Sequence, residues 1–452
     1  MDDILNHIDR HFDETVTRLQ ALCRQPSIAA QGDGMAEAAE LVQRMLAEAG
    51  ALVEVVPSAG YPFVLGRFAG ACAKTLMFYN HYDVQPPEPL ELWESPPFAA
   101  EIRDGRIYAR GVADNKGNLV ARIWALRAWR EIHGGPPVGV RFLVEGEEES
   151  GSPHLAAFTE SHADLLRADG CIWESGDVSA RGRPHLYLGM KGVLSVEMEA
   201  RGAASDLHSG WGTIAPNPAW RLVWALNRLK GPTEEILIDG FYDGVEGPTH
   251  EEIRRFRRLP FPEREILQNW QIPAFLQDLT DGGLLLCQFY TPTATINGFE
   301  AGRIDEGART VVPAVARARL DFRLVPKQRP DEVFDLLCRY LREEGYGDIE
   351  VRQLGMSFLP FRTDPQAPFV RAVVEASRTT FGREPAVFPT AGGSGPMYLV
   401  GEKLGIPVVG LGVGHSGANI HGADENLRLA NLGRGIVHIA AILARLAEGL
   451  PA

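Results

Sequence analysis

Phe142-Leu-Val-Glu-Gly-Glu-Glu-Glu-Ser-Gly-Ser152 is an apolar, strand-like run that ends in four acidic residues within five positions. Carboxylates packed this densely at the end of a buried strand repel one another and lose hydration, so they are costly unless a cation lies among them. The stretch therefore indicates a metal site. Taken alone, it has an alternative interpretation as a solvated acidic loop at the start of a helix, where Glu favours the positive end of the helix dipole.

Strand-like and helix-like patterns alternate on both sides of this stretch. Leu76–Tyr79 leads directly into Asn80-His-Tyr-Asp83, Gly117–Trp129 has helical character, and Gly170–Trp173 is a further short apolar run. Such alternation favours a parallel or mixed sheet covered by helices. Ligands of open α/β sheets gather beyond the carboxyl ends of the strands, which is where Asn80–Asp83, the acidic run and Glu174 fall.

The pattern changes near Gly192, where alternating apolar residues suggest half-buried antiparallel strands. Helices are expected at Pro218–Leu229 and Pro330–Glu344, and the α/β pattern returns from Pro368. The fold class expected is α/β, with a mixed, mostly parallel sheet covered by helices and an inserted α+β domain. The expected division is a catalytic domain made of residues 1–191 and 357–452, and an inserted lid and dimerisation domain at 192–356.

Composition limits the classes of function. The 452 residues include 59 Asp and Glu against 45 Lys and Arg, a formal net charge of −14, which argues against nucleic-acid and membrane partners. Five widely spaced cysteines without a Cys-x-x-Cys pair indicate reduced thiols. The N-terminal residues do not resemble a signal sequence, and we expect no apolar run long enough to span a bilayer. A soluble cytoplasmic protein is therefore expected.

Individually, the other polar motifs also have ordinary explanations. His81 and Asp83 are two residues apart, so on an extended backbone they share a face and could serve a metal or only make a loop contact. Asp114 stands just before a helix, where it could cap the N-terminus. His415 and His421 occupy a turn-rich loop, and either could be a surface residue.

Taken in order, these motifs resemble a known family, the co-catalytic zinc metallopeptidases that include aminoacylase, carboxypeptidase G, succinyl-diaminopimelate desuccinylase and carnosinase. The resemblance runs through nearly the whole chain and is strongest to the carnosinase-type dipeptidases. The residues that carry it are His81-Tyr-Asp-Val-Gln-Pro86, Trp93, Pro97, Phe98, Asp114-Asn-Lys-Gly117, Glu148-Glu149, Glu174 and His421.

The resemblance implies two divalent metal ions per chain that share one bridging carboxylate. Nitrogen and oxygen donors with open positions suit Zn²⁺, and Mn²⁺ or Co²⁺ accept the same donors. Asp177 competes with Glu174 as a ligand, but Glu174-Ser-Gly matches the motif register. The implied ligands are Asp114 as the bridge, His81 and Glu174 at one site, and Glu149 and His421 at the other.

The resemblance also implies the catalytic roles. Asp83 would orient His81, and Glu148 would be the general base, which takes a proton from a metal-held water and returns it to the departing amine. Adjacent glutamates can divide the roles of base and ligand because neighbouring side chains point in different directions. Glu145 and Glu147 are expected to support the site or to be solvated.

The inserted domain contains a stretch, Ser205-Asp-Leu-His-Ser-Gly210 with Asn217-Pro218, that resembles the lid motif of the family. This implies a homodimer in which His208 reaches the active site of the partner subunit and hydrogen-bonds the tetrahedral oxyanion. Arg323 matches the residue that binds the terminal carboxylate of the substrate. Locally, His208 could be a surface residue and Arg323 an ordinary ion pair. The further substrate-binding residues implied are Asn217, Gly393 and Ser394.

The function expected is hydrolysis of the amide bond of dipeptides or short peptides with a free terminal carboxylate. An N-acyl amino acid deacylase or desuccinylase with the same metal centre is the alternative enzyme. A metal-free binding or scaffold protein is the alternative of another class. Glu148 argues against the scaffold, which has no need of an unligated carboxylate beside the metals.

Overall fold

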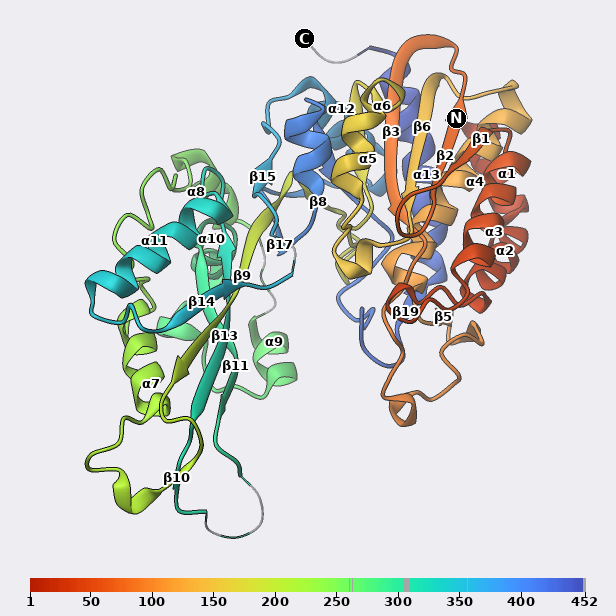
Figure 1. Cartoon of the computed structure of the whole chain (residues 1–452). Helices are drawn as coiled ribbons and strands as arrows, with labels where there is room; N and C mark the ends of the chain where they lie inside the picture. Colours follow the sequence, from red (N-terminus) through yellow and green to blue (C-terminus); the bar gives the residue numbers. More distant parts are fainter. Residues whose placement is uncertain (260, 262, 305–306, 308, 356, 450–452) are drawn as a thin grey trace. The chain divides into compact units, whose positions relative to one another are not determined.

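The structure is a computed structural model that describes residues 1–259, 261, 263–304, 307, 309–355 and 357–449. The chain divides into two compact units (Figure 1). The first unit contains Met1–Gly189, Arg362–Ala391 and Pro396–Ala452, and the second contains Met190–Phe361 and Gly392–Gly395. The expected end of the inserted domain, residue 356, lies outside the described residues.

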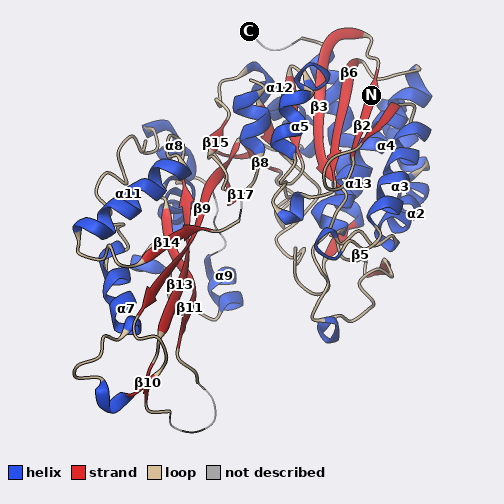
Figure 2. Ribbon diagram, viewed as in Figure 1, coloured by secondary structure: helices blue, strands red, loops and turns tan. Residues whose placement is uncertain are grey.

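A mixed eight-stranded sheet forms the centre of the first unit (Figure 2). Its inner strands β6, β3, β7 and β18 pair in parallel, and antiparallel pairs join β1 to β2, β2 to β6 and β18 to β8. The α/β class with a mixed sheet is therefore confirmed. The strands in spatial order are β1 (Leu52–Val56), β2 (Phe63–Phe68), β6 (Val138–Glu145), β3 (Cys72–His81), β7 (Gly170–Trp173), β18 (Val408–Gly410), β8 (His185–Tyr187) and β16 (Ala386–Phe388).

The inner strands are buried at their carboxyl ends. The last six residues of β3, the last four of β6 and all four of β7 are buried, because helices cover both faces of such a sheet. The polar residues that end or follow these strands are consequently buried as well: His81 is 0%, Glu145 1% and Glu174 5% exposed.

Eight α-helices belong to the first unit among the described residues, and α13 packs against both α4 and α12. Apolar residues near the N-terminus recur at helical spacing and predict one amphipathic helix. The chain opens instead with two helices, because His11 leaves helical geometry with φ −106° and ψ 13°. The helices are α1 (Asp2–Arg10), α2 (Phe12–Arg24), α3 (Met35–Glu48), α4 (Gly117–His133), α5 (Leu155–Ser161), α6 (Ala163–Leu166), α12 (Pro368–Phe381) and α13 (Leu429–Ala447).

Helix α13 corrects the expectation that no segment is long enough to span a bilayer. It has 19 residues and an 18-residue window with mean hydropathy 1.3, so by length and composition alone it is long and apolar enough to cross a membrane. However, 56% of this window is buried inside the protein. Its apolar residues, including Ile436, Ile439 and Leu443, belong to the hydrophobic core of the first unit. The apolar character of α13 is therefore explained by core packing.

The second unit is built on a six-stranded sheet, in which β11, β13, β9 and β14 lie side by side and the short strands β15 (Phe361–Arg362) and β17 (Ala391–Ser394) also pair with β9; α7 and α11 pack on one face. Leu194, Val196 and Met198 of β9 join side chains of α7 and α11 in one hydrophobic core, as the alternating pattern predicts. The strands, in spatial order, are β11 (Thr293–Ala301), β13 (Val315–Leu324), β9 (Gly189–Arg201) and β14 (Glu350–Gln353), and the main helices are α7 (Pro218–Leu229) and α11 (Pro330–Glu343).

Strand β11 is not predicted from the sequence, because residues 231–302 are rich in Pro, Gly and charged residues and show only short helical pieces. Short helices are present, namely α8 (His250–Phe256), α9 (Glu263–Trp270) and α10 (Asp281–Tyr290). Most side chains of β11 are exposed or half-buried, because it forms the edge of the sheet and pairs only with β13. Its sequence therefore lacks the apolar alternation that reveals a half-buried strand.

Arg122 of α4 joins the carboxyl ends of three inner strands. It is 1% exposed, and its guanidinium donates hydrogen bonds to the carbonyls of Tyr79 at 2.7 Å, Trp173 at 2.5 Å and Leu411 at 3.3 Å. Burial lowers the pKa of Arg122 to about 10, so the side chain remains charged at neutral pH. These carbonyls lie at or near the carboxyl ends of the strands, so Arg122 satisfies buried acceptors there and connects the three strands.

We predict that Arg122→Met lowers the free energy of unfolding by about 3 kcal/mol or more, because several buried acceptors lose their donor at once. Arg130→Met is the matched control: Arg130 lies on the same helix, is exposed and donates to the Glu48 carbonyl, so its replacement costs less than about 1 kcal/mol. Urea denaturation followed by tryptophan fluorescence measures both. Equal losses in the two variants would contradict the role given to Arg122.

Candidate metal centre

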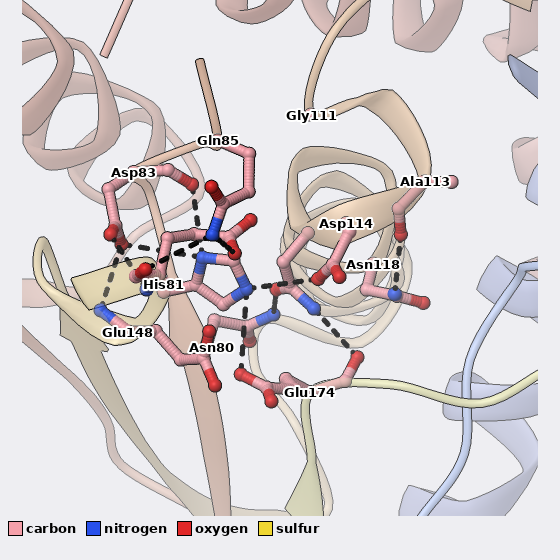
Figure 3. A network of polar contacts seen from close by, with 12 residues as sticks. Asn80, His81, Asp83, Gln85, Gly111, Ala113, Asp114, Asn118, Glu148 and Glu174 are labelled. Carbon is pink, nitrogen blue, oxygen red and sulfur yellow. Dashed lines mark hydrogen bonds and ion pairs between the residues drawn. The ribbon is translucent and has the colours of Figure 1, made fainter. Parts of the chain in front are cut away.

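Two groups of potential metal ligands lie at the carboxyl ends of the inner strands, and Figure 3 shows the network that surrounds them. In each group, one nitrogen or oxygen atom per residue lies within 4.8 Å of the others. Both groups combine an imidazole with two carboxylates. We call them the His81 group, which contains His81, Glu148 and Glu174, and the His421 group, which contains Asp114, Glu149 and His421.

Asp114 joins the two groups. Its Oδ1 lies 3.1 Å from His81 Nε2, and its Oδ2 lies 3.5 Å from His421 Nε2. On their other sides, His81 Nε2 lies 3.6 Å from Glu174 Oε2 and His421 Nε2 lies 3.1 Å from Glu149 Oε2. A carboxylate with one oxygen toward each group has the arrangement of a bridging ligand. The alternative of a helix cap has no support, because α4 begins without a side-chain cap.

The donor set fits divalent cations. Glu174 Oε2 is buried and has no hydrogen-bond partner. Within the described part of the chain, the ion pairs of Asp114, Glu149 and Glu174 are all to histidines, with no Lys or Arg among them. Buried carboxylates without cationic partners are costly, and imidazole nitrogens with carboxylate oxygens are donors that zinc accepts.

Burial and the crowding of carboxylates raise the pKa values of several side chains in the two ligand groups. Burial, reinforced by the neighbouring Glu174 carboxylate, raises the pKa of Glu148 well above its usual range. Burial also raises the pKa of Glu174 to about 8. Hydrogen bonds to Asp114 and Glu149 raise the pKa of His421 to about 10. In the metal-free chain, protons thus supply positive charge that bound cations would replace.

Asp83 positions both His81 and the acidic turn. It is 0% exposed, and its carboxylate accepts the backbone N–H groups of Glu148 at 3.2 Å and Glu149 at 3.0 Å. His81 Nδ1 lies 3.0 Å from the Asp83 carbonyl and 3.4 Å from Oδ1 (Figure 3). With Nδ1 occupied in this way, Nε2 faces Asp114, which is the orientation that a metal-binding imidazole needs.

A buried ion pair that the sequence analysis missed holds the two loops together. Arg110 Nη1 donates to Glu425 Oε2 at 2.8 Å, and Arg110 Nη2 donates to the His421 carbonyl at 3.1 Å. The Arg110 and Glu425 side chains are each 1% exposed. The Glu425 carboxylate also accepts three backbone N–H groups from the loop that leads to α4, those of Gly111, Ala113 and Asp114.

Gly111 allows the turn between Arg110 and Asp114. Its φ is +80°, and a Cβ at this position would lie 2.2 Å from Val84 Cγ1. The loop can therefore approach Glu425 only with glycine at this position. Arg110 and Gly111 belong to a recognisable motif in the sequence, but no local spacing connects them with Glu425, which lies more than 300 residues away.

Two of the neighbouring candidates have structural partners instead. Asp177 forms an ion pair with His185, and only Glu174 of the two carboxylates belongs to the His81 group. His415 is 4% exposed and its Nε2 lies 3.1 Å from Asn426 Oδ1. Burial lowers the pKa of His415 to about 4, so it is a neutral residue inside its loop at physiological pH.

Of the two expectations for Glu145 and Glu147, support of the site or solvation, the structure agrees with the first. Glu145 is 1% exposed and accepts hydrogen bonds from Tyr79 Oη and Ser152 Oγ. Burial raises its pKa to about 8. Glu147 is 8% exposed and pairs with His154 at 2.7 Å. Both side chains are therefore part of the packed support of the acidic turn.

The remaining predicted site residues belong to the second unit. Arg323 Nη1 donates to Ser394 Oγ at 2.8 Å, because β17 (Ala391–Ser394) pairs with β9 beside β13. Gly393 is an exposed residue of the same short strand. Arg323 Nε also donates to Asp321 Oδ2 at 3.2 Å, so the ordinary ion pair that the sequence allowed for Arg323 is present.

His208 and Asn217 occupy another part of this unit. His208 ends the short strand β10 (Leu207–His208), is exposed, and its Nδ1 accepts the Gly210 N–H at 3.0 Å, which leaves Nε2 available to a ligand. Asn217 Oδ1 caps α7 by accepting the N–H of Ala219 at 2.9 Å. The side-chain oxygen of Asn217 therefore has a structural role.

Comparisons with known proteins identify metallopeptidases as similar to this chain. The chain matches Peptidase family M20/M25/M40 over residues 77–445. It is 27% identical to Beta-Ala-His dipeptidase from Homo sapiens, over 99% of this chain and 93% of that protein. It is 28% identical to Cys-Gly metallodipeptidase dug1 from Schizosaccharomyces pombe, over 100% of this chain and 99% of that protein.

Solved structures agree in fold over nearly the whole length. An M20 family metallo-carboxypeptidase, Sso-CP2 from Sulfolobus solfataricus, has a TM-score of 0.90 at 34% identity and covers 96% of this chain and 99% of its own. Human carnosine dipeptidase 1 has a TM-score of 0.81 at 26% identity, and the match covers 99% of this chain and 98% of the carnosine dipeptidase chain. The likeness therefore extends over both units, and the matched range 77–445 contains the positions of both ligand groups.

We predict that Asp114→Ala loses bound metal as well as activity, because the bridge offsets the mutual repulsion of two cations. Asp364→Ala is the control, since Asp364 lies in the same unit and only accepts the Gln366 N–H at the entry to α12. Metal content per chain, measured by mass spectrometry after gel filtration, distinguishes them. Retention of two tightly bound ions by Asp114→Ala would contradict the bridging role.

Proposed function

Because the chain belongs to Peptidase family M20/M25/M40, we propose that it is a di-metal dipeptidase. It hydrolyses the amide bond of dipeptides or short peptides that have a free terminal carboxylate. The observation that carries the proposal is Asp114, whose two oxygens face His81 and His421. The names of the similar proteins, dipeptidases and a carboxypeptidase, support peptides as substrates. They give no support to the N-acyl amino acid deacylase or desuccinylase.

Two divalent cations, preferably Zn²⁺, would be held by the side chains already described. His81 and Glu174 serve one ion, Glu149 and His421 the other, and Asp114 serves both. When bound, two such ions polarise a scissile carbonyl and lower the pKa of a water molecule. The requirement for open coordination positions is met because each ion receives only three protein side chains.

Glu148 is the general base in this proposal. Its backbone is held by Asp83 at 3.2 Å, and its side chain lies within the His81 group. The adjacent Glu149 points instead to His421. Glu148 takes a proton from the attacking water and then donates it to the amide nitrogen as the carbon–nitrogen bond breaks, which regenerates the carboxylate and releases an amine.

We predict that Glu148→Gln removes turnover while the metals stay bound, since the proton carrier is lost but every proposed ligand remains. General-base loss costs at least about 10²- to 10⁴-fold in kcat. Glu147→Gln is the matched control: it is the preceding residue and pairs with His154 outside both groups. Dipeptide hydrolysis and metal content are measured on the same samples. Near-normal turnover of Glu148→Gln with two metals would refute the assignment.

Arg323 binds the terminal carboxylate of the substrate in this proposal, together with Ser394 and Gly393, and Asn217 is a further substrate-binding residue elsewhere in the unit. A guanidinium offers two parallel N–H donors to a carboxylate. The contact of 2.8 Å between Arg323 Nη1 and Ser394 Oγ supports a joint site. Gly393 would contact the substrate through its backbone. Asn217 would contact the substrate through its side-chain nitrogen, since its side-chain oxygen caps α7.

The chain forms a homodimer through the second unit. Trp220 and Trp224 of α7 stack at 6.0 Å although they are 57% and 53% exposed. Trp211 is also 57% exposed and lies just after His208. Exposed aromatic clusters of this kind mark protein interfaces. In the dimer, His208 Nε2 donates a hydrogen bond to the oxyanion in the partner's active site.

We predict that a mixed dimer of Glu148→Ala and His208→Ala chains is active, although both parent homodimers are nearly inactive. In the mixed dimer, one centre combines an intact Glu148 from one chain with an intact His208 from the other. Loss of an oxyanion donor costs about 10²- to 10³-fold in kcat. Co-expression with two affinity tags yields the heterodimer, and dipeptide hydrolysis is the readout. No gain over the parents would rule out action across subunits.

The remaining properties follow from composition. All five cysteines lie in the described part of the chain and are free thiols, which supports a reducing compartment such as the cytoplasm. The net charge of −14 disfavours nucleic-acid and membrane partners.

A further inference from the structure

A cavity of about 470 Å³ in the first unit is lined by arginines and by no Asp or Glu. Its walls come from the loop after β7, the end of α12 and the start of α13, and neither ligand group contributes to it. The cavity is therefore distinct from the metal centre. The four arginines that line it are Arg181, Arg383, Arg428 and Arg434.

These arginines lack the anionic partners that surface arginines usually find. Among the described residues, none of the four pairs with a carboxylate, whereas the neighbouring Arg378 binds Glu384 at 2.7 Å. The contact that Arg383 makes is to the carbonyl of Arg181. In a chain with net charge −14, four unpaired guanidinium groups around one cavity create a local positive potential.

The start of α13 adds to this potential. Ala430 and Asn431, in the first turn of this 19-residue helix, lie on the cavity wall. The helix begins without a side-chain cap and without an acidic residue in its first turn. Helix N-termini of this kind present free N–H groups and a positive partial charge to anions.

The arginines and the start of α13 line the same cavity. An anionic ligand in the cavity would meet the guanidinium groups and the helix start together.

We propose that this cavity binds the phosphoryl group of a small molecule. Guanidinium groups and helix N-termini recognise phosphoryl oxygens in combination. The cavity of about 470 Å³ exceeds what a single phosphate ion fills and lies in the usual range for organic ligands. Phe381 on the wall offers an apolar contact to the remainder of such a molecule. The shared chemistry is the phosphoryl group, which free phosphate or a phosphate monoester can supply.

The site adjoins segments that lead to the metal centre. Val178 on the cavity wall is four residues after Glu174, and its N–H bonds the Gly414 carbonyl at 3.0 Å. Arg428 is three residues after Glu425, which holds the Asp114 loop. Occupation of the cavity therefore stabilises both segments, and this consequence does not depend on the proposed peptidase activity.

Calorimetric titration of the purified, metal-loaded protein with adenosine monophosphate, inorganic phosphate and adenosine tests the proposal. We expect one phosphate-dependent site per chain and no binding of adenosine. Arg434→Gln and Arg428→Gln each weaken binding by at least about tenfold, because a charge-assisted hydrogen bond is lost. Arg378→Gln, which removes the same charge from α12 outside the cavity, changes the affinity by less than about twofold.

The outcomes distinguish an organic phosphate from inorganic phosphate, and binding in the cavity from binding at the metal centre. Tighter binding of the monophosphate identifies an organic phosphate, and equal binding identifies inorganic phosphate; both support the site. Phosphate binding that is unchanged in both arginine variants but disappears when the metals are removed belongs to the metal centre and overturns the proposal. Absence of any phosphate-dependent binding at millimolar concentration also overturns it. Arg434 is exposed on α13, so Arg434→Gln is expected to fold. This variant therefore tests the site even if Arg428→Gln does not fold.

Discussion

The carboxylate of Asp114 lies between the imidazoles of His81 and His421, at distances of 3.1 and 3.5 Å. Much of the surrounding structure holds it there. Glu425 accepts the N–H groups of its loop, and Arg110 connects that loop to the carbonyl of His421. These contacts are buried, so their loss would leave charged groups without partners at considerable cost. A costly concentration of negative charge is thus fixed in place by backbone hydrogen bonds, which is the condition for holding two cations at a defined separation.

The sheet explains why such distant residues meet. Parallel strands bring their carboxyl ends to one edge, and buried strands leave few polar residues except at those ends. Arg122 binds the carbonyls at the ends of three strands, so the loops that follow start from one fixed point. The second unit contributes a different contact, in which the Arg323 guanidinium donates a hydrogen bond to Ser394 Oγ.

The apolar runs with polar ends predict the α/β class and the inner strands, because buried strands have a strong local signal. The residues of the two ligand groups have no such signal, and only the resemblance to the metallopeptidase family implied them. The sequence does not predict β11, whose edge position removes the apolar alternation. It does not predict the pair of Arg110 and Glu425 either, since only folding brings these residues together. Whether Glu145 supports the site or is solvated stays open in the sequence for a related reason: its partner Tyr79 comes from the neighbouring strand. Long-range polar contacts are therefore the part of the site that local patterns cannot show.

We propose that two cations share Asp114. Diffraction from a crystal of the purified enzyme, with anomalous data collected on both sides of the zinc edge, tests this arrangement most directly. We expect two peaks about 3.5 to 4 Å apart, one beside His81 and Glu174, the other beside Glu149 and His421, and both in contact with Asp114. A single peak, or two peaks of which only one touches Asp114, would contradict it.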